Sequence, residues 1–407
     1  HAAPPVQTSC GSHGPAEARH TVPAAVSTLA GQLLLPLQTS CGSHAPPEAL
    51  LHRLGDPPDL EAPLRANLGV VHTRFGRYDE ALAALQRAIA LETRPQHPQL
   101  AVYHRDLGNV HYRRGRYVEA EAAYELAITL GEAALGPDHP ENARTINNLG
   151  EAHRVQGHIA AAERCFTRSI AGWERAFGPD HPMSAPPLNG LGTLAYNRGD
   201  LTSAAAHFER VRVILERSHG PAHPDVGAVT SNLGEILLRQ GALAQSQQAS
   251  ERALEILSAA LGPDHETLAD VYCNLARALA LQGQLEPAAA HLARALAASE
   301  RTHGPDGAPL AKPLTGQGLL ALIRGRPTEA VPLFERALAL GGLQNPIELA
   351  ELRLGLARAL WDTRQDQPRA RTLAEQARAE LTRAGANPAA AEIAGALDRW
   401  LADHPAP

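Results

Sequence analysis

A repeating pattern of small residues runs through most of this 407-residue chain and limits the folds that it can adopt. With Gly69 as the reference, a small residue returns after 39 residues, then five times after 42, and once more after 39. The reference positions are Gly69, Gly108, Gly150, Gly192, Gly234, Ala276, Gly318 and Ala357. In seven units a glycine lies seven residues later, and an alanine or serine twelve residues later. The chain is therefore an array of repeats.

Each repeat is predicted to form two helices. In the third unit, apolar residues recur at spacings of three and four over residues 139–157 and again over 158–178, as they do on one face of a helix. Gly157 separates the two stretches and Gly178 ends the second. Alanine and leucine, which favour helices, supply most of the apolar residues, whereas aromatic residues make up only 4%. The sequence therefore predicts an all-α chain built from antiparallel helix pairs.

The linker "LGPDHP" (135–140) returns as "FGPDHP" (177–182), "HGPAHP" (219–224) and "LGPDHE" (261–266). Gly136 lies where a helix should stop, Asp138 is expected to cap the next helix, and Pro140 suits a first helical turn. Successive linkers should lie one repeat apart, about 10 Å, which is too far for one metal ion to bridge. We therefore interpret the recurring linker histidines as part of a helix linker and expect no metal.

The spacing of small residues resembles the tetratricopeptide pattern, in which one small residue is followed by alanines twelve and nineteen positions later. Pairs such as Ala81/Ala88 and Ala120/Ala127 follow it. With the longer period and the linker, about residues 55–380 are similar to the tetratricopeptide region of kinesin light chains and their bacterial relatives. This resemblance implies a right-handed α-α superhelix, a solenoid of about eight antiparallel helix pairs.

Three segments are expected along the chain. Residues 1–50 form a low-complexity segment that is too poor in apolar residues to fold, residues 51–386 form the array, and residues 387–407 form a capping helix and tail. In the capping helix, Leu397, Trp400 and Leu401 should cover the exposed end of the last repeat.

The N-terminal segment contains a duplicated heptamer, "QTSCGSH" (7–13 and 38–44). Cys10, Cys41, His13 and His44 could in principle supply four zinc ligands. Their 31-residue separation is loose, however, and no fold surrounds them. We therefore favour a simple duplication, with no cofactor.

No constellation of catalytic residues is found. "HRDLGNVH" (104–111) begins like a kinase catalytic loop, but His111 replaces the required asparagine and the stretch falls inside a predicted helix. The chain also lacks G-x-S-x-G, H-E-x-x-H and P-loop motifs, so we expect no enzyme. A net charge of −6 gives no general attraction to nucleic acid or to an anionic membrane. Four scattered cysteines favour a reducing, cytoplasmic location.

The resemblance also implies where a ligand would bind, because in tetratricopeptide proteins the first helix of each pair lines a concave wall. The candidate binding residues on these helices are Asn67, Arg74, Arg105, Asn109, Arg113, Arg144, Asn147, Asn148, Arg154, Asn189, Asn232 and Asn274. Asparagine amides can pair with a peptide backbone, and arginine with carboxylates. Kinesin light chains bind acidic cargo peptides on this wall, so we expect a scaffold for an extended, acidic peptide.

Two alternatives stay open. The array weakly resembles the C-terminal sensory parts of bacterial serine/threonine kinases, which implies a regulatory region of a larger signalling enzyme. The polar residues could instead form a solvated helix face whose arginines pair with neighbouring helices. The sequence does not define the oligomeric state.

Overall fold

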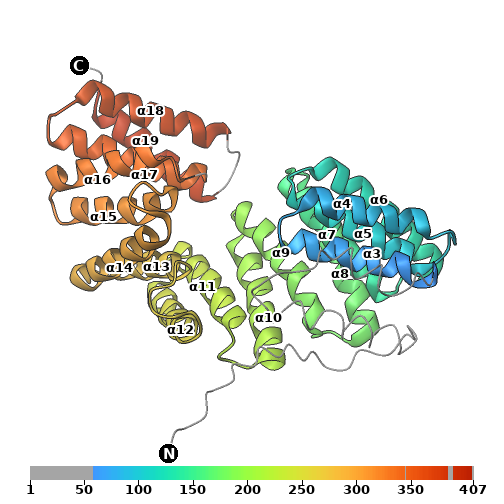
Figure 1. Cartoon of the computed structure of the whole chain (residues 1–407). Helices are drawn as coiled ribbons and strands as arrows, with labels where there is room; N and C mark the ends of the chain where they lie inside the picture. Colours follow the sequence, from blue (N-terminus) through green and yellow to red (C-terminus); the bar gives the residue numbers. More distant parts are fainter. Residues whose placement is uncertain (1–57, 344, 384–387, 406–407) are drawn as a thin grey trace, which may run out of the picture. The chain divides into compact units, whose positions relative to one another are not determined.

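The computed structural model describes residues 58–343, 345–383 and 388–405, which form seventeen α-helices and no strand (Figure 1). The chain is divided into two compact units. One ends at Leu130 and the other begins at Gly131. The first unit contains α3 (Pro58–Arg74), α4 (Tyr78–Leu91), α5 (Pro98–Arg113) and most of α6 (Tyr117–Leu135).

The second unit contains the remaining helices. They are α7 (Pro140–Val155), α8 (Ile159–Phe177), α9 (Ala185–Asn197), α10 (Leu201–His219), α11 (Pro224–Arg239), α12 (Leu243–Leu261), α13 (Leu268–Leu281), α14 (Leu285–His303), α15 (Ala311–Ile323), α16 (Pro327–Leu340), α17 (Pro346–Asp362), α18 (Gln367–Arg383) and α19 (Pro388–Asp403). Short 3₁₀ turns, Pro182–Ser184 and Ala308–Leu310, precede α9 and α15.

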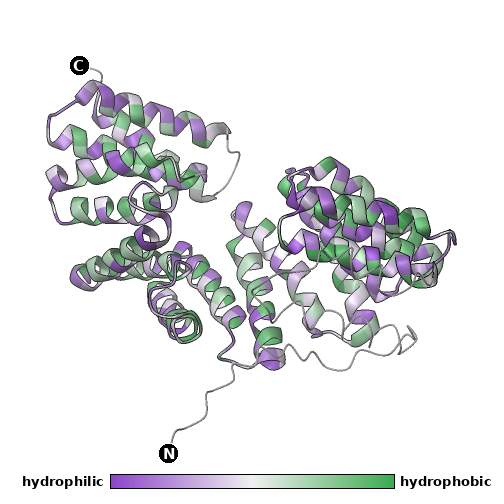
Figure 2. Ribbon diagram, viewed as in Figure 1, coloured by the Kyte–Doolittle hydropathy of each residue, from purple (hydrophilic) through white to green (hydrophobic). Residues whose placement is uncertain are grey.

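Helices pair in chain order, so that an odd-numbered first helix from α3 to α17 is followed by its even-numbered second helix. In each of the two units, consecutive helices pack against each other. Hydrophobic and hydrophilic residues alternate along the ribbons, as expected for amphipathic helices (Figure 2). The prediction of an all-α fold with about eight helix pairs and a final capping helix is confirmed.

The reference glycines are the points where the two helices of a pair come closest. A Cβ atom on Gly108 would lie 2.5 Å from the Tyr124 ring, and one on Gly150 would lie 2.8 Å from the Phe166 ring. Both distances are far below van der Waals contact, so only glycine fits there. The large partner lies sixteen residues after the glycine in both pairs, which is why the 42-residue period is visible in the sequence.

Two phenylalanines also connect successive pairs. Phe166 of α8 is fully buried and packs against Gly150 of α7 and Gly190 of α9. Phe334 of α16 is likewise fully buried and packs against Gly318 of α15 and Gly355 of α17. One ring thus fills the space between its own first helix and the next one, so the same contact forms the pair and stacks it on its neighbour.

The turn inside each pair requires a positive φ. Gly325, between α15 and α16, has φ +71°, and no atom lies within 4 Å of the place where its Cβ would be. In the last pair this turn contains one extra residue, and Arg364 takes the glycine's place with φ +56°. The backbone of the last turn is therefore strained because Arg364 has a side chain, whereas a glycine at this position would not be strained.

We expect Arg364→Gly to stabilise the last pair by about 0.5–1 kcal/mol. Relief of about 1–2 kcal/mol of left-handed strain should exceed the cost of about 0.5–1 kcal/mol for the greater backbone freedom of glycine. Urea unfolding and hydrogen exchange of the α17 and α18 amides measure the change. The matched control is Gly325→Ala, which should destabilise α15 and α16. A fall in stability for Arg364→Gly would contradict this account of the turn.

The linker histidines cap helices, and the expectation that Asp138 would do so is wrong. His139 Nδ1 accepts a hydrogen bond from the backbone N–H of Glu141 at 3.2 Å, at the start of α7. The other three linker histidines accept equivalent bonds from the residue two positions on. At α17 the same role falls to Asn345, whose side chain accepts from Ile347 N at 2.9 Å. A proline follows His139, His181, His223 and Asn345 in the first helical turn, where its missing N–H is not needed.

The linker aspartates instead connect successive second helices. Asp138 pairs with Arg175 at 2.7 Å, Asp180 with Arg217 at 2.7 Å, and Asp264 with Arg301 at 2.7 Å. These pairs are solvent-exposed, and each contributes at most about 1 kcal/mol. Their regular spacing explains why the linker repeats an aspartate as well as a histidine.

Helix α19 packs on α17 and α18 and covers the apolar end of the last pair. Leu397 is fully buried, and the Trp400 ring meets Trp361 edge-to-face with centroids 5.6 Å apart. Arg371 of α18 donates to the carbonyl of His404 at 2.6 Å, which fixes the end of the helix. The predicted capping role is confirmed.

The predictions for residues 1–50, including the duplicated heptamer and the zinc alternative at Cys10 and Cys41, lie outside the described residues. Within the described ranges, none of the helices is long and apolar enough to cross a membrane. Neither Cys165, which is half-buried, nor Cys273, which is buried, forms a disulfide. Burial raises the pKa of the Cys273 thiol to about 12, so it is an unreactive core residue.

Candidate functional site

In the second unit, the first helices lie on the inner side of the curve. Most successive first helices of this unit pack against each other, namely α7 with α9, α11 with α13, α13 with α15 and α15 with α17. Among the described elements of this unit, no pair of successive second helices makes a comparable contact. A stack that is closer on one side bends toward that side, so polar residues on the first helices line the inner wall. In the first unit, α3 and α5 are likewise in contact.

The first unit places five predicted binding residues on α3 and α5. Asn67, Arg74 and Arg113 are exposed, whereas Arg105 and Asn109 are half-buried. The half-buried pair shares one carboxylate, because Arg105 lies 3.1 Å from Asp106 Oδ1 and the Asn109 amide donates to the same oxygen at 3.4 Å.

Tyr124 of α6 completes this network by donating its hydroxyl to Asn109 Oδ1 at 2.9 Å. Asn109 is therefore held from two sides, and its orientation is fixed by α6 as well as by its own helix. Burial raises the pKa of the Tyr124 hydroxyl, which remains a donor at any ordinary pH.

Helix α7 carries the next four predicted residues, and all four interact along the helix. Arg154 pairs with Glu151 at 2.8 Å, while Arg144 lies 3.8 Å from Glu141. The Asn147 amide donates to Asn148 Oδ1 at 3.4 Å. The arginines of α7 are thus partly neutralised by the carboxylates three residues away.

The remaining predicted asparagines do not share one environment. Asn189 of α9 and Asn232 of α11 are exposed, but Asn274 of α13 is buried, with 7% of its surface accessible. Asn232 and Asn274 both lie two residues before a reference position, so this register does not give equal exposure along the array. The difference arises because α13 is buried on more of its circumference than α11.

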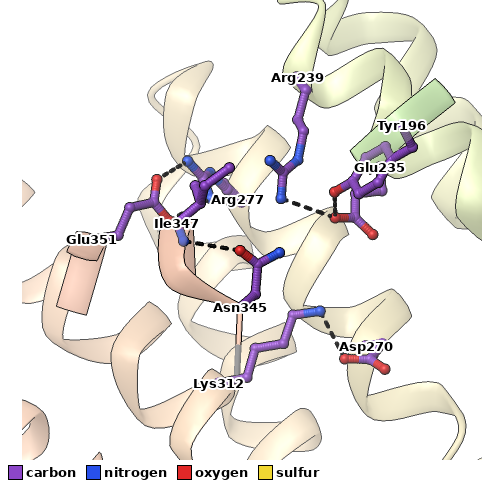
Figure 3. Close-up of polar contacts among 9 residues, drawn as sticks. All are labelled: Tyr196, Glu235, Arg239, Asp270, Arg277, Lys312, Asn345, Ile347 and Glu351. Atoms are coloured by element: carbon purple, nitrogen blue, oxygen red, sulfur yellow. Dashed lines mark hydrogen bonds and ion pairs between the residues drawn. The ribbon is translucent and has the colours of Figure 1, made fainter. Parts of the chain in front are cut away.

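The strongest concentration of charge lies on the inner wall of the second unit. We call it the inner charged cluster, and Figure 3 shows most of it. It comprises Tyr196 of α9, Glu235 and Arg239 of α11, Asp270 and Arg277 of α13, Lys312 of α15, and Glu348 and Glu351 of α17. Five consecutive first helices therefore contribute to it.

Its first part joins α9 to α11. The Tyr196 hydroxyl donates to Glu235, and Arg239 lies 3.4 Å from the same carboxylate. The Arg239 guanidinium also stacks 4.8 Å from the centre of the Tyr196 ring, a cation–π contact. Burial, followed by the Glu235 charge, raises the pKa of Tyr196, so the phenol stays protonated and keeps donating.

Its second part joins α13 to α15 and α17. Lys312 Nζ lies 2.8 Å from Asp270 Oδ1, and Arg277 makes two hydrogen bonds to Glu351, at 3.0 and 2.5 Å. Burial acts to lower the pKa of Lys312, but Asp270 and Glu235 outweigh it and the pKa lies above its usual value. Lys312 is therefore a fixed positive charge.

Glu348 faces the same space, and its environment disfavours a charge. Burial is the main cause of its raised pKa; Lys312 opposes this effect and Glu235 adds to it. Ionised Glu348 thus sits among other carboxylates in a half-buried position. The cluster has four carboxylates against three cations, so it bears an excess negative charge when all of them are ionised.

One group of side chains has the proximity of a metal site. Ligand atoms of His219, His223 and Asp225 lie within 4.8 Å of one another. However, His223 Nδ1 already accepts the Asp225 N–H, and the His219 ring lies 4.6 Å from the His223 ring. In the preceding linker Phe177 stacks on His181 in the same way, at 4.4 Å. Ring packing and helix capping therefore explain this group without a metal.

A family comparison agrees with this geometry. The tetratricopeptide repeat family model matches residues 59–132, 98–174, 143–217, 183–256 and 225–301, which together span more than half of the chain. The chain belongs to the tetratricopeptide repeat family. No curated protein matches the sequence.

Several solved structures are similar to this chain at low sequence identity. The apo form of the quorum sensor NprR from B. thuringiensis is 14% identical, with a TM-score of 0.56 over 88% of this chain and 96% of that chain. A Rap protein complexed with Competence and Sporulation Factor is 14% identical, with a TM-score of 0.51 over 86% and 100%. A putative kinesin light chain from Podosopora anserina is 20% identical, with a TM-score of 0.45 over 51% and 97%.

None of the eight members of the inner charged cluster is among the binding residues predicted from the sequence, and Lys312, Glu348 and Glu351 of the last two repeats are the members considered next. A usable signal was present for two of them, because Lys312 and Glu351 lie six residues before the reference positions Gly318 and Ala357. Asp270 and Arg144 occupy the same register on α13 and α7. Glu348 lies outside the wall positions of a regular repeat, and no local pattern marks it.

We expect Glu348→Gln to stabilise the protein at pH 7, because the folded state disfavours the charge that glutamine lacks. A raised pKa means that the folded state of the native protein gains stability as the pH falls. The advantage of the variant should therefore shrink through the folded pKa and vanish below the ordinary pKa of glutamate. Urea midpoints from pH 4 to 8 measure it. Glu351→Gln, which removes the partner of Arg277, is the control and should give no such gain.

Proposed function

We propose that this tetratricopeptide repeat protein is an interaction scaffold that binds an extended, acidic peptide along its first helices. The observation that carries the proposal is the register of Arg74 and Arg113. Each lies five residues after the reference position of its helix, on the consecutive first helices α3 and α5, and each is exposed. No ion pair within the described residues involves either of them, so both guanidinium groups are available to a ligand.

The spacing of these helices suits an extended chain. Packed neighbouring helices lie about 8–10 Å apart, and a polyproline II segment repeats its side-chain direction every three residues, over about 9 Å. Acidic side chains at every third position could therefore meet one arginine each. The exposed amide of Asn67 can pair with the peptide backbone between them.

The chemistry of arginine and the fold both support the proposed binding of an acidic peptide. Arginine binds carboxylates through two parallel hydrogen bonds. Arg105 and Arg154 already pair with carboxylates of the array, which is the group that an acidic peptide would offer. A similar fold is known in complex with Competence and Sporulation Factor.

The test is fluorescence anisotropy of the full chain with a labelled peptide that has a glutamate at every third position. The variant Arg74→Gln/Arg113→Gln should bind about tenfold more weakly, since each lost exposed charge contact is worth up to about 1 kcal/mol. Added salt should weaken binding by the native protein and affect the variant less.

Arg164→Gln/Arg294→Gln is the matched control, because it removes two exposed arginines from the second helices α8 and α14. This control should bind like the native protein. Equal affinity for a lysine peptide of the same spacing, or an undiminished affinity of the Arg74/Arg113 variant, would reject the acidic-peptide proposal. Absence of binding to any peptide would favour the regulatory region of a larger signalling enzyme.

A further inference from the structure

The ion pair between Arg277 and Glu351 differs from the other long pairs of the array. Those pairs connect adjacent repeats, as Lys312 of α15 does with Asp270 of α13. Arg277 of α13 instead reaches α17, 74 residues away, and passes over the repeat between them (Figure 3). Its two nitrogens bind the two oxygens of Glu351 at 3.0 and 2.5 Å.

Both side chains belong to the inner wall. Arg277 directly follows the reference position Ala276, and Glu351 lies six residues before Ala357. The Arg277 side chain is 50% exposed and that of Glu351 is 21% exposed, so the pair stands at the surface of the wall and not in the core. A ligand that enters along the first helices therefore meets it.

The carboxylate of Glu351 occupies the guanidinium of Arg277 in the same bidentate way that an acidic ligand would. Solvent reaches the Arg277 side of the pair and weakens it, so another carboxylate can replace Glu351 at modest cost. Burial acts to lower the pKa of Arg277, but Glu351 outweighs it, with smaller contributions from Glu235 and Glu348, so the pKa lies above its usual value. Arg277 is thus permanently charged and surrounded by carboxylates.

We infer that Arg277 is a carboxylate-docking position of the second unit, and that Glu351 is an internal occupant which competes with an acidic ligand for it. This inference rests on the proposed peptide-binding function and deepens it. It gives α17 a regulatory role. Glu351 of this helix lowers the affinity of the inner wall for an acidic ligand until the ligand displaces Glu351 from Arg277.

A matched ion pair elsewhere in the same unit provides the control. Glu335 of α16 and Arg369 of α18 form a bidentate pair at 2.6 and 2.9 Å, but both residues lie on second helices. Glu335→Gln removes the same charge and the same kind of bond as Glu351→Gln, away from the inner wall.

The experiment measures the affinity of the full chain for a labelled acidic peptide by fluorescence anisotropy. Glu351→Gln should bind about three- to fivefold more tightly than the native protein, the fold-change that matches an exposed ion pair. Glu335→Gln should not change the affinity. Glu351→Asp keeps the charge but is one methylene shorter, so it should also bind more tightly if occupancy of Arg277 is the cause.

The decisive comparison places Glu351→Gln in an Arg277→Gln background. There the gain should disappear, because Glu351 acts only through Arg277. A gain that persists would identify a general charge effect and overturn the inference. Peptide binding by the native protein with no gain in Glu351→Gln or Glu351→Asp would overturn this inference alone. Failure of every variant to bind would overturn the proposed function, and this inference with it.

Discussion

The fold depends on one recurring contact, the close approach of a small residue, usually glycine, on a first helix to the second helix that follows it. At Gly108 and Gly150 the gap is too small for any Cβ atom. Two of the rings at this contact, Phe166 and Phe334, also touch the first helix of the next pair. Packing within a pair and stacking between pairs are therefore one interaction, and repeating it builds the array.

This contact separates structural from functional positions. Second helices supply the rings and the arginine–aspartate pairs that connect repeats, so their inner faces are constrained. First helices supply small residues at the contact and leave their polar positions free to vary. The inner charged cluster lies at these variable polar positions. Its residues come from α9, α11, α13, α15 and α17 and share no sequence motif.

The sequence predicted the parts of the fold that repeat locally. The period, the helix pairs, the turn glycines and the cap formed by α19 all follow from residues within about one repeat of each other. The capping atom was misassigned, since Asp138 and His139 are both good acceptors and only the geometry of the linker selects the histidine. Arg364 shows that a turn can keep its shape without the glycine that marks it elsewhere.

The candidate site could be predicted only in part. Exposed Asn67, Arg74, Arg113, Asn189 and Asn232 stand where the repeat register placed them, but Asn274 is buried. The bond from Arg277 to Glu351 could not be predicted, because it depends on how tightly several repeats curve together. Curvature accumulates from small rotations at each stacked pair, and no single residue encodes it.

The central claim is that first helices bind ligands while second helices hold the array together. Hydrogen exchange of the full chain, with and without a saturating acidic peptide, tests this claim most directly. The account predicts added protection on first helices such as α3, α5 and α7, with the outer faces of α8, α10 and α12 unchanged. Protection confined to the second helices would contradict it.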